Sequence, residues 1–175
     1  MFESEKKYPI VKLSDVCDIA KGQQVNADQL SESGAFPCYN GGIEPSGYWH
    51  EFNTIGNSIS ISEGGNSCGF VNFQHENYWC GAHCYHLDNV TCDVYFLYCQ
   101  LKVHQEIIMG LRSGSCLPNI KKSTIQNYPV IIPPLEEQTR FSAFAQESDK
   151  SKFELLEAIS RIDKLIKSLI QQENE

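Results

Sequence analysis

Residues 135–172 contain neither glycine nor proline, and they follow directly on the double proline Pro133-Pro134. A double proline stops a preceding strand and can lead into a helix. Apolar residues then recur at spacings of 4, 3, 4 and 3, which is a heptad seam. The seam consists of Leu155, Ile159, Ile162, Ile166 and Leu169. At 1.5 Å per residue the helix would be roughly 50 Å long. Because a small domain cannot bury such a rod, we favour a coiled-coil arm over a solvated helix packed on its own domain.

Residues 8–132 have a different character, with many Gly, Asn, Ser, Tyr and Cys residues between short apolar stretches. The period-two alternation of Ser58–Ser62 predicts a half-buried strand. Further expected strands lie at 8–13, 69–73, 78–87 and 128–132. A helical turn is expected over 14–20, and an amphipathic helix over 94–108. The predicted fold class is α+β: a strand-rich globular domain with a few helices (1–134), followed by a long C-terminal coiled-coil helix (135–175).

The net charge of −8 argues against non-specific binding to phosphates, which needs a basic face. Lys6-Lys7 and Lys121-Lys122 are the only adjacent pairs of basic residues. If this chain binds DNA, a few placed cations and polar loops, or a partner protein, must supply the contacts. The polar segment 1–7 lacks the apolar core of a secretion signal, and no window is apolar enough to span a bilayer. We therefore expect a cytoplasmic protein without membrane contact.

Catalytic motifs are absent from the sequence. It contains no nucleophile elbow, no phosphate-binding glycine loop and no adenine-methyltransferase tetrapeptide. The eight cysteines are irregularly spaced, which favours reduced thiols in the core over a disulfide framework. Residues 80–86 hold two cysteines and two histidines, but no second pair of zinc ligands with the proper spacing exists elsewhere. We predict no metal site, and a strand with buried cysteines and exposed histidines.

Several segments, in order, resemble the specificity subunit of type I restriction-modification enzymes. They are YPIVKLSDVCDIAKG (8–22), FPCYNGGI (36–43) followed by Gly47-Tyr48, ISISEGGNSCGFV (59–71), PNIKK (118–122) and PVIIPPLEEQ (129–138). The last segment is the most specific, because it resembles the family's junction into a long spacer helix. A full subunit of this family has two target-recognition domains and two spacer helices. This sequence has one of each and so resembles a half subunit.

The resemblance implies a non-catalytic protein that reads double-stranded DNA and positions methylase and restriction subunits on a bipartite target. No cofactor is expected in this chain, since S-adenosylmethionine would be bound by the methylase subunits. A half subunit would form a homodimer, or pair with another half subunit, through the seam from Leu155 to Leu169. The spacer helices would then set the distance between two half-sites.

Base reading needs hydrogen-bonding side chains on loops. The candidate DNA-binding residues are Lys21, Gln23, Gln24, Tyr39, Asn40, Asn66, Ser67, Arg112, Ser113 and Ser115, with Lys121 and Lys122 as phosphate contacts. Two other functions remain open. The acidic charge favours an assembly adaptor that binds proteins through its coiled coil and does not bind DNA. A zinc enzyme built on Cys80, His83 and Cys84 is the less favoured alternative.

Overall fold

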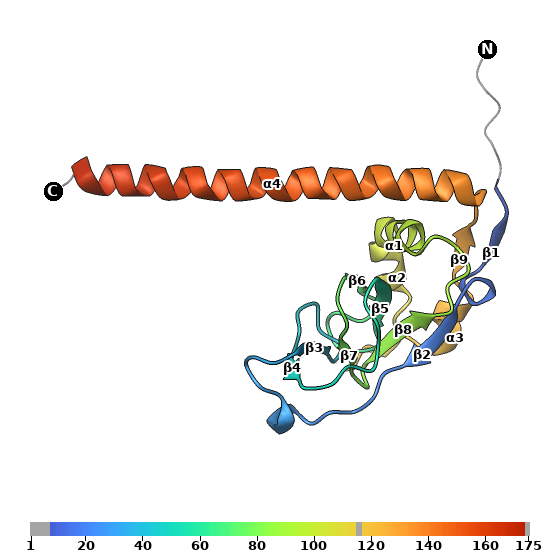
Figure 1. Cartoon of the computed structure of the whole chain (residues 1–175). Helices are drawn as coiled ribbons and strands as arrows, with labels where there is room; N and C mark the ends of the chain where they lie inside the picture. Colours follow the sequence, from blue (N-terminus) through green and yellow to red (C-terminus); the bar gives the residue numbers. More distant parts are fainter. Residues whose placement is uncertain (1–7, 115–116, 174–175) are drawn as a thin grey trace, which may run out of the picture. The chain divides into compact units, whose positions relative to one another are not determined.

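The computed structural model describes residues 8–114 and 117–173. By internal contacts the chain divides into two units, residues 1–138 and 139–175. The first unit combines three small sheets with short helices, and the second is the bulk of a single long helix (Figure 1). This architecture confirms the predicted α+β class and the long C-terminal helix.

A four-stranded antiparallel sheet forms the centre of the first unit. Its strands lie in the order β2 (Asp18–Lys21), β8 (Cys84–Asp88), β5 (Ser58–Ser62) and β6 (Val71–Gln74). β5 and β6 form a hairpin in which Ile59 pairs with Phe73, and β5 has the bounds predicted from its alternation. All five residues of β5 are buried, so the expectation of a half-buried strand was wrong. β5 is a central strand, and its polar face is satisfied internally: Gln74 Nε2 donates to Ser60 Oγ at 3.1 Å.

The segment predicted as a helical turn over 14–20 is only partly helical. A 3₁₀ turn covers Leu13–Asp15, and the residues that follow form β2, which pairs with β8. Ile19 is 4% exposed and sits opposite Leu87 in the sheet. The apolar residues Val16, Ile19 and Ala20 fit a helical period as well as a strand. The pairing with β8, which is distant in sequence, decides between them.

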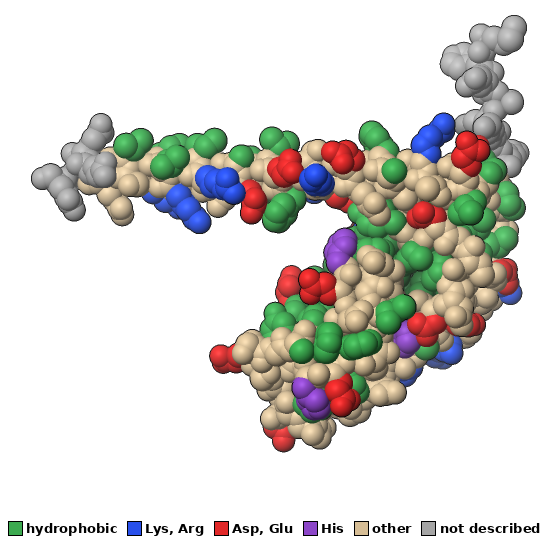
Figure 2. All heavy atoms as spheres, viewed as in Figure 1, with side chains coloured by type: hydrophobic (Ala, Val, Ile, Leu, Met, Phe, Trp, Pro, Cys, Tyr) green, Lys and Arg blue, Asp and Glu red, His purple; other side chains and the backbone are tan. Residues whose placement is uncertain are grey.

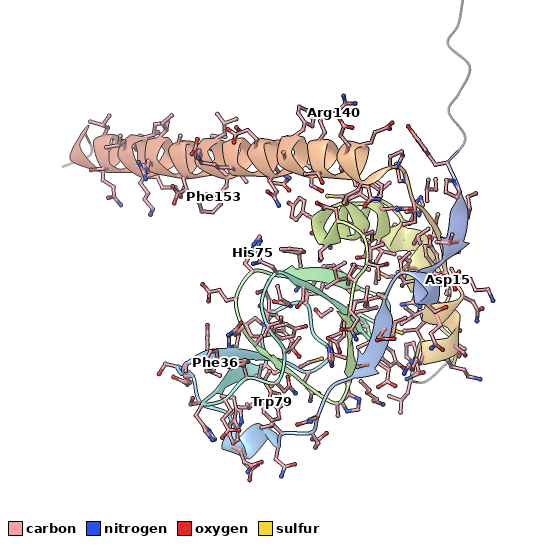
Figure 3. All side chains as sticks on the ribbon, turned by 45° about the vertical axis from the view of Figure 1, so that its right-hand side comes forward. Asp15, Phe36, His75, Trp79, Arg140 and Phe153 are labelled. Carbon is pink, nitrogen blue, oxygen red and sulfur yellow. The ribbon has the colours of Figure 1, made fainter. Side chains whose placement is uncertain are left out.

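Two smaller sheets flank the central one. β1 (Ile10–Lys12) pairs antiparallel with β9 (Pro129–Ile131). β3 (Phe36–Tyr39) lies between β4 (Gly47–Trp49), which is antiparallel to it, and β7 (Trp79–Cys80), which is parallel to it. Figure 3 labels Phe36 and Trp79 on this three-stranded sheet. The stretch predicted as one strand over 78–87 is thus β7 and β8, separated by a turn.

Short helices cover the main core. The helix predicted over 94–108 is divided at His104 into α1 (Val94–Val103) and α2 (Gln105–Gly110). The Asp93 carboxylate caps α1 by accepting the N–H of Phe96 at 2.8 Å. α3 (Lys122–Gln126) leads into β9, and a 3₁₀ turn covers Ala27–Gln29. Leu97 and Leu101 of α1 pack with Ile59, Ile61 and the other residues of the central sheet's core.

The start of α4 (Leu135–Glu173) is attached to the first unit by Gln138. The Gln138 side chain is buried; it accepts the N–H of Asp93 at 2.9 Å and donates to the carbonyl of Pro133 at 2.7 Å. The neighbouring Glu137 accepts the hydroxyl of Tyr8 at 2.5 Å. These bonds give a physical role to the last two residues of the segment PVIIPPLEEQ: they fix where the long helix leaves the domain.

We predict that Gln138→Ala lowers the free energy of unfolding by about 2 kcal/mol, because a buried N–H and a buried carbonyl lose their partner. Thermal or urea unfolding followed by circular dichroism measures this loss. The control is Glu136→Ala, whose side chain is exposed on the same turn and should change stability by less than about 0.5 kcal/mol. Equal stability of the two variants would contradict the role given to Gln138.

Candidate nucleic-acid interface

Several loops of the first unit meet at the turn formed by residues 80–84. Gly22 donates its N–H to the carbonyl of Cys84 at 3.0 Å, and Gln23 donates to the carbonyl of Cys80 at 2.8 Å. On the other side Gly81 donates to the carbonyl of Tyr39 at 2.8 Å. The turn therefore holds the loop after β2 and the loop after β3 through backbone hydrogen bonds.

The hairpin turn after β5 is joined to the same place. Glu63 donates its N–H to the carbonyl of His83 at 2.8 Å, and Ile120 donates to the carbonyl of Glu63 at 2.9 Å. The carbonyl of Gly41 accepts the hydroxyls of Ser62 and Ser67. Segments that lie up to about a hundred residues apart in sequence are thus adjacent, and the residues between β5 and β6 connect them.

Close packing explains two glycines at this junction. A Cβ on Gly22 would lie 2.3 Å from the carbonyl oxygens of Cys80 and Gly81. A Cβ on Gly81 would lie 2.5 Å from Asn40 Oδ1. The backbone segments can approach this closely only because both positions lack a side chain.

These loops surround a groove of about 510 Å³, which we call the loop groove. Its lining residues are Asn40, Gly41, Gly42, Gly64, Gly65, Ser67, His83, Leu117, Pro118 and Asn119. None of these residues carries a carboxylate, although the chain has a net charge of −8. Beside the apolar Leu117 and Pro118, the groove presents amides, a hydroxyl, an imidazole and bare backbone, which are groups that read base edges and phosphates.

Asn40 and His83 are oriented by neighbouring groups. Asn40 Oδ1 accepts the backbone N–H of His83 at 3.2 Å, which leaves the amide NH₂ of Asn40 for a ligand. The His83 ring is 62% exposed, and its Nδ1 lies 4.0 Å from Glu63 Oε2. Glu63 itself is nearly buried. Its carboxylate accepts Lys21 Nζ at 2.8 Å and the Tyr85 hydroxyl at 3.0 Å.

The structure brings most of the predicted DNA-binding residues to this region. Asn40 and Ser67 line the groove, and the exposed Asn66 lies beside Ser67 in the same turn. Ser113 is paired with Asn119 through two backbone hydrogen bonds of 2.9 Å, which places Arg112 next to the groove segment. Lys121 and Lys122 are exposed and follow Asn119 by two and three residues.

Three predicted residues are placed differently. Tyr39 points into a small second core and contacts the Tyr78 ring at 5.8 Å between centroids. Gln23 and Gln24 are exposed near β7, where the indole N–H of Trp79 donates to the Gln23 carbonyl at 3.0 Å. They do not line the loop groove. Ser115 lies outside the described residues.

The cysteines act as buried core residues. Cys80 is fully buried and Cys84 is 2% exposed. The pKa of Cys84 is lowered, chiefly by the hydrogen bond from the Cys80 thiol and also by the N–H of Gly41 at 3.2 Å, while burial acts in the opposite direction. Burial raises the pKa of Cys38 to about 11. Among residues 8–114 and 117–173 no His, Cys, Asp and Glu side chains form a group that could hold a metal ion.

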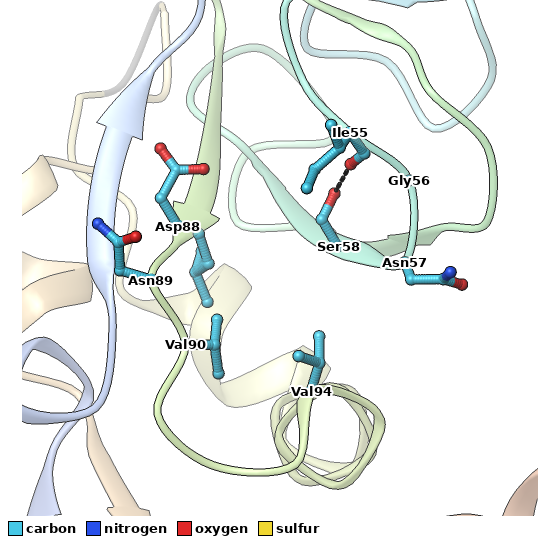
Figure 4. A pocket seen from close by; sticks show the side chains of 9 residues that line it. Ile55, Gly56, Asn57, Ser58, Asp88, Asn89, Val90 and Val94 are labelled. Carbon is cyan, nitrogen blue, oxygen red and sulfur yellow. Dashed lines mark hydrogen bonds between the residues drawn. The ribbon is translucent and has the colours of Figure 1, made fainter.

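A second hollow lies at the opposite end of β8 from the 80–84 turn (Figure 4). It measures about 360 Å³ and is lined by Ile55, Val90 and Val94 together with Asp88, Asn57 and Asn89. Ser58 donates its hydroxyl to the carbonyl of Ile55 at 2.8 Å within this hollow. The Asp88 carboxylate makes it a poorer place for a polyanion than the loop groove.

The apolar side of α4 is exposed to solvent along the predicted seam, where the residues are between 49% and 65% exposed. Leu156, Leu165 and Ile170 flank the seam and are 55%, 64% and 55% exposed. Figure 2 shows hydrophobic side chains along the length of this helix. The apolar face is therefore wider than the two-position seam predicted from the sequence, and we call these eight residues the α4 apolar face. None of the described helices could traverse a lipid bilayer.

The sequence of this chain matches a known protein family. The family model of the type I restriction modification DNA specificity domain matches residues 5–165. The chain belongs to this family.

Curated relatives carry the same family name. A Mycoplasma pneumoniae protein named as a type I specificity subunit is 35% identical over 130 residues, covering 72% of this chain and 34% of its own length. A Mycoplasma genitalium protein with the same description is 33% identical over 121 residues, covering 67% of this chain and 31% of its own length. The specificity-domain chain thus spans about a third of the length of these relatives.

Solved structures show the same fold. The S subunit of a type I restriction-modification system from M. genitalium superposes with a TM-score of 0.77 at 26% identity, over 86% of this chain and 41% of that subunit. The HsdS subunit from Thermoanaerobacter tengcongensis gives a TM-score of 0.59 at 20% identity, over 86% of this chain and 39% of that one. The fold of this specificity domain is that of the S subunits.

Two polar side chains that line the loop groove, His83 and Asn119, were not among the predicted DNA-binding residues. His83 was considered only as a zinc ligand, and Asn119 only as part of a turn. The sequence gives one usable signal for His83: it lies between two buried cysteines in a glycine-containing turn, where a side chain that is not part of the core must be exposed. Nothing local marks Asn119, since its place in the groove depends on pairing with Ser113.

Proposed function

We propose that this chain is a sequence-specific DNA-binding subunit that positions methylase and restriction subunits on a bipartite target. The observation that carries the proposal is the loop groove: a carboxylate-free lining with asparagine and histidine side chains, in an acidic chain that belongs to the specificity-domain family. Asparagine reads adenine edges in the major groove of DNA, and loops presented by a rigid sheet are well suited to reach them.

Cations near the loop groove would hold the duplex in place. Lys121 and Lys122 follow the groove segment at Asn119, Arg112 precedes its pairing partner Ser113, and Lys21 is fixed by the Glu63 carboxylate. Contacts of this kind position a protein on DNA without reading its sequence. Because these four cations are few for a DNA-binding protein, we propose that the methylase subunits supply the remaining phosphate contacts.

The α4 apolar face would join this chain to a second copy, or to another half subunit, so that two recognition domains read two half-sites. The methylase subunits would bind S-adenosylmethionine and perform the chemistry, and this chain would bind no cofactor. Each of these assignments is part of the proposal, since the matched part of this chain covers only about a third of the length of these relatives.

Duplex DNA binding at two salt concentrations tests the proposal. We expect the chain in complex with its methylase subunits to bind duplex DNA, with a loss of affinity of roughly 100-fold between 50 and 200 mM salt if about four phosphates are contacted. The double variant Lys121→Gln, Lys122→Gln should reduce the salt slope by about 2 without changing sequence preference. The control is Lys150→Gln with Lys164→Gln, which removes two exposed cations from α4.

A second candidate function is a protein adaptor that does not bind DNA. The α4 apolar face favours it, because such a face needs a protein partner whether or not the first unit binds DNA. The same titration separates the two candidates. If duplex DNA does not bind at either salt concentration, with or without methylase subunits, the adaptor is the better description.

A further inference from the structure

We infer that Asn40 and His83 read a single adenine together, as one hydrogen-bonding unit within the loop groove. This inference rests on the proposed function and adds to it the residues and the base. Both side chains line the groove, and the Asn40 carboxamide is joined to the backbone of His83 by the 3.2 Å hydrogen bond. A ligand that contacts one of them is therefore adjacent to the other.

The hydrogen bond to His83 determines which group Asn40 offers. A backbone N–H can only be accepted by the oxygen of the carboxamide, so this bond fixes Oδ1 toward the 80–84 turn. The NH₂ group then faces away from that bond. No partner for it is found among the described residues. Asn40 thus presents a hydrogen-bond donor to the groove.

The Glu63 carboxylate lies on the Nδ1 side of the His83 ring, with Nδ1 4.0 Å from Glu63 Oε2. This distance is too long for a hydrogen bond, so Glu63 marks one side of the ring and leaves Nε2 on the side that does not face the carboxylate. In the proposed contact His83 accepts a hydrogen bond through Nε2. Glu63 is held in place by Lys21 and Tyr85, so the carboxylate cannot easily turn away. His83 is 62% exposed and presents this acceptor to solvent.

A donor beside an acceptor matches one base. In the major groove adenine offers N7 as an acceptor and the N6 amino group as a donor. The Asn40 NH₂ would donate to N7, and His83 Nε2 would accept from N6. Guanine offers O6 in place of the amino group, so two acceptors would face each other at His83. The pair therefore selects adenine and also rejects guanine.

Selection from a randomised duplex library tests this inference. The full chain is purified in complex with its methylase subunits, and bound DNA is sequenced for the wild type and for each variant. For the wild type we expect at least one position at which adenine is preferred over guanine by roughly 5- to 150-fold. His83→Ala and Asn40→Ala should each reduce the preference at that same position to near parity and leave the other positions unchanged.

Two further variants test the roles of the groups. His83→Gln retains an acceptor oxygen and should keep most of the adenine preference. His83→Arg replaces the acceptor by donors and should change the preferred base at that position to guanine. The control is His75→Ala, because His75 is exposed, lies outside the loop groove and should leave every preference unchanged (Figure 3). Circular dichroism and thermal unfolding show that each variant is folded.

The outcomes separate the inference from the proposed function. If the wild type selects a motif and the Asn40 and His83 variants select the same motif with unchanged preferences, the inference is wrong and the proposed function stands. It is also wrong if the two variants relax different positions, or weaken binding equally for all sequences. If the wild type complex selects no motif, the proposed function fails and the inference fails with it.

Discussion

Replacing Ile159 and Ile162 together by aspartate should leave the chain monomeric in light scattering, while the unmodified chain has at least twice the monomer mass. Both isoleucines are 54% exposed at the centre of the α4 apolar face. In a paired helix each aspartate would carry its charge into a dry interface, at a cost of several kcal/mol per carboxylate. The helix itself should persist, because both substitutions are on its surface. Circular dichroism would detect a loss of helix.

The matched control for this pair is Ser168→Asp with Gln171→Asp. It adds the same two charges at the same spacing, on the side of α4 that faces away from the seam. We expect this variant to keep the mass of the unmodified chain. If the aspartates at 159 and 162 leave the mass unchanged, the α4 apolar face is not the interface. If the unmodified chain is already a monomer, self-association through this helix is refuted.

The second large effect is expected from Gly22→Ala, which should lower the free energy of unfolding by about 1–3 kcal/mol and abolish duplex binding. The new Cβ would lie 2.3 Å from the backbone oxygens of Cys80 and Gly81, and backbone atoms cannot move aside as a flexible side chain can. The loop after β2 would have to leave the 80–84 turn, which would carry Lys21 away from Glu63. Urea unfolding and duplex titration of the same samples measure both effects.

Gly110→Ala is the control for this substitution. Gly110 ends α2, and a Cβ there would meet no atom within 4 Å. Since alanine favours a helix more than glycine does, this variant should be as stable as the wild type or slightly more stable. If Gly22→Ala unfolds at the same urea concentration as the wild type, the loop after β2 can rearrange without loss of stability. Its close packing against the 80–84 turn is then not needed.

The sequence predicted best those elements that depend on local pattern. α4 followed from the absence of glycine and proline after Pro134, and β5 followed from its alternation. The sequence misassigned the segment from Asp18 to Lys21, because its apolar spacing suits a helix and a strand equally. Only pairing with β8, more than sixty residues away, selects the strand. The burial of both faces of β5 was missed for the same reason: a strand's own residues do not tell how many neighbours it has.

The candidate site was predicted in part. Loop residues such as Asn40 and Ser67 were chosen for their chemistry and do line the groove, whereas Tyr39, chosen on the same grounds, belongs to a buried cluster. An aromatic residue beside a glycine-rich turn can either line a loop or belong to a core. The burial of Tyr39 depends on its contact with Tyr78, which the sequence does not reveal. His83 and Asn119 were not predicted because their proximity comes from the assembled loops.

The way in which the loops are attached to the 80–84 turn affects how readily the side chains of the loop groove can be exchanged. The bonds that hold the loops after β2, β3 and β5 to the turn join backbone to backbone, except where Asn40 Oδ1 accepts from His83 and where Cys84 Sγ accepts from Gly41. Side chains such as Asn66 and Asn119 can therefore be exchanged without loss of the bonds that shape the groove. Under the proposed function, mutations that alter the target sequence would then carry little stability cost, so that evolution or a protein engineer could retarget the domain while its sheets stay the same.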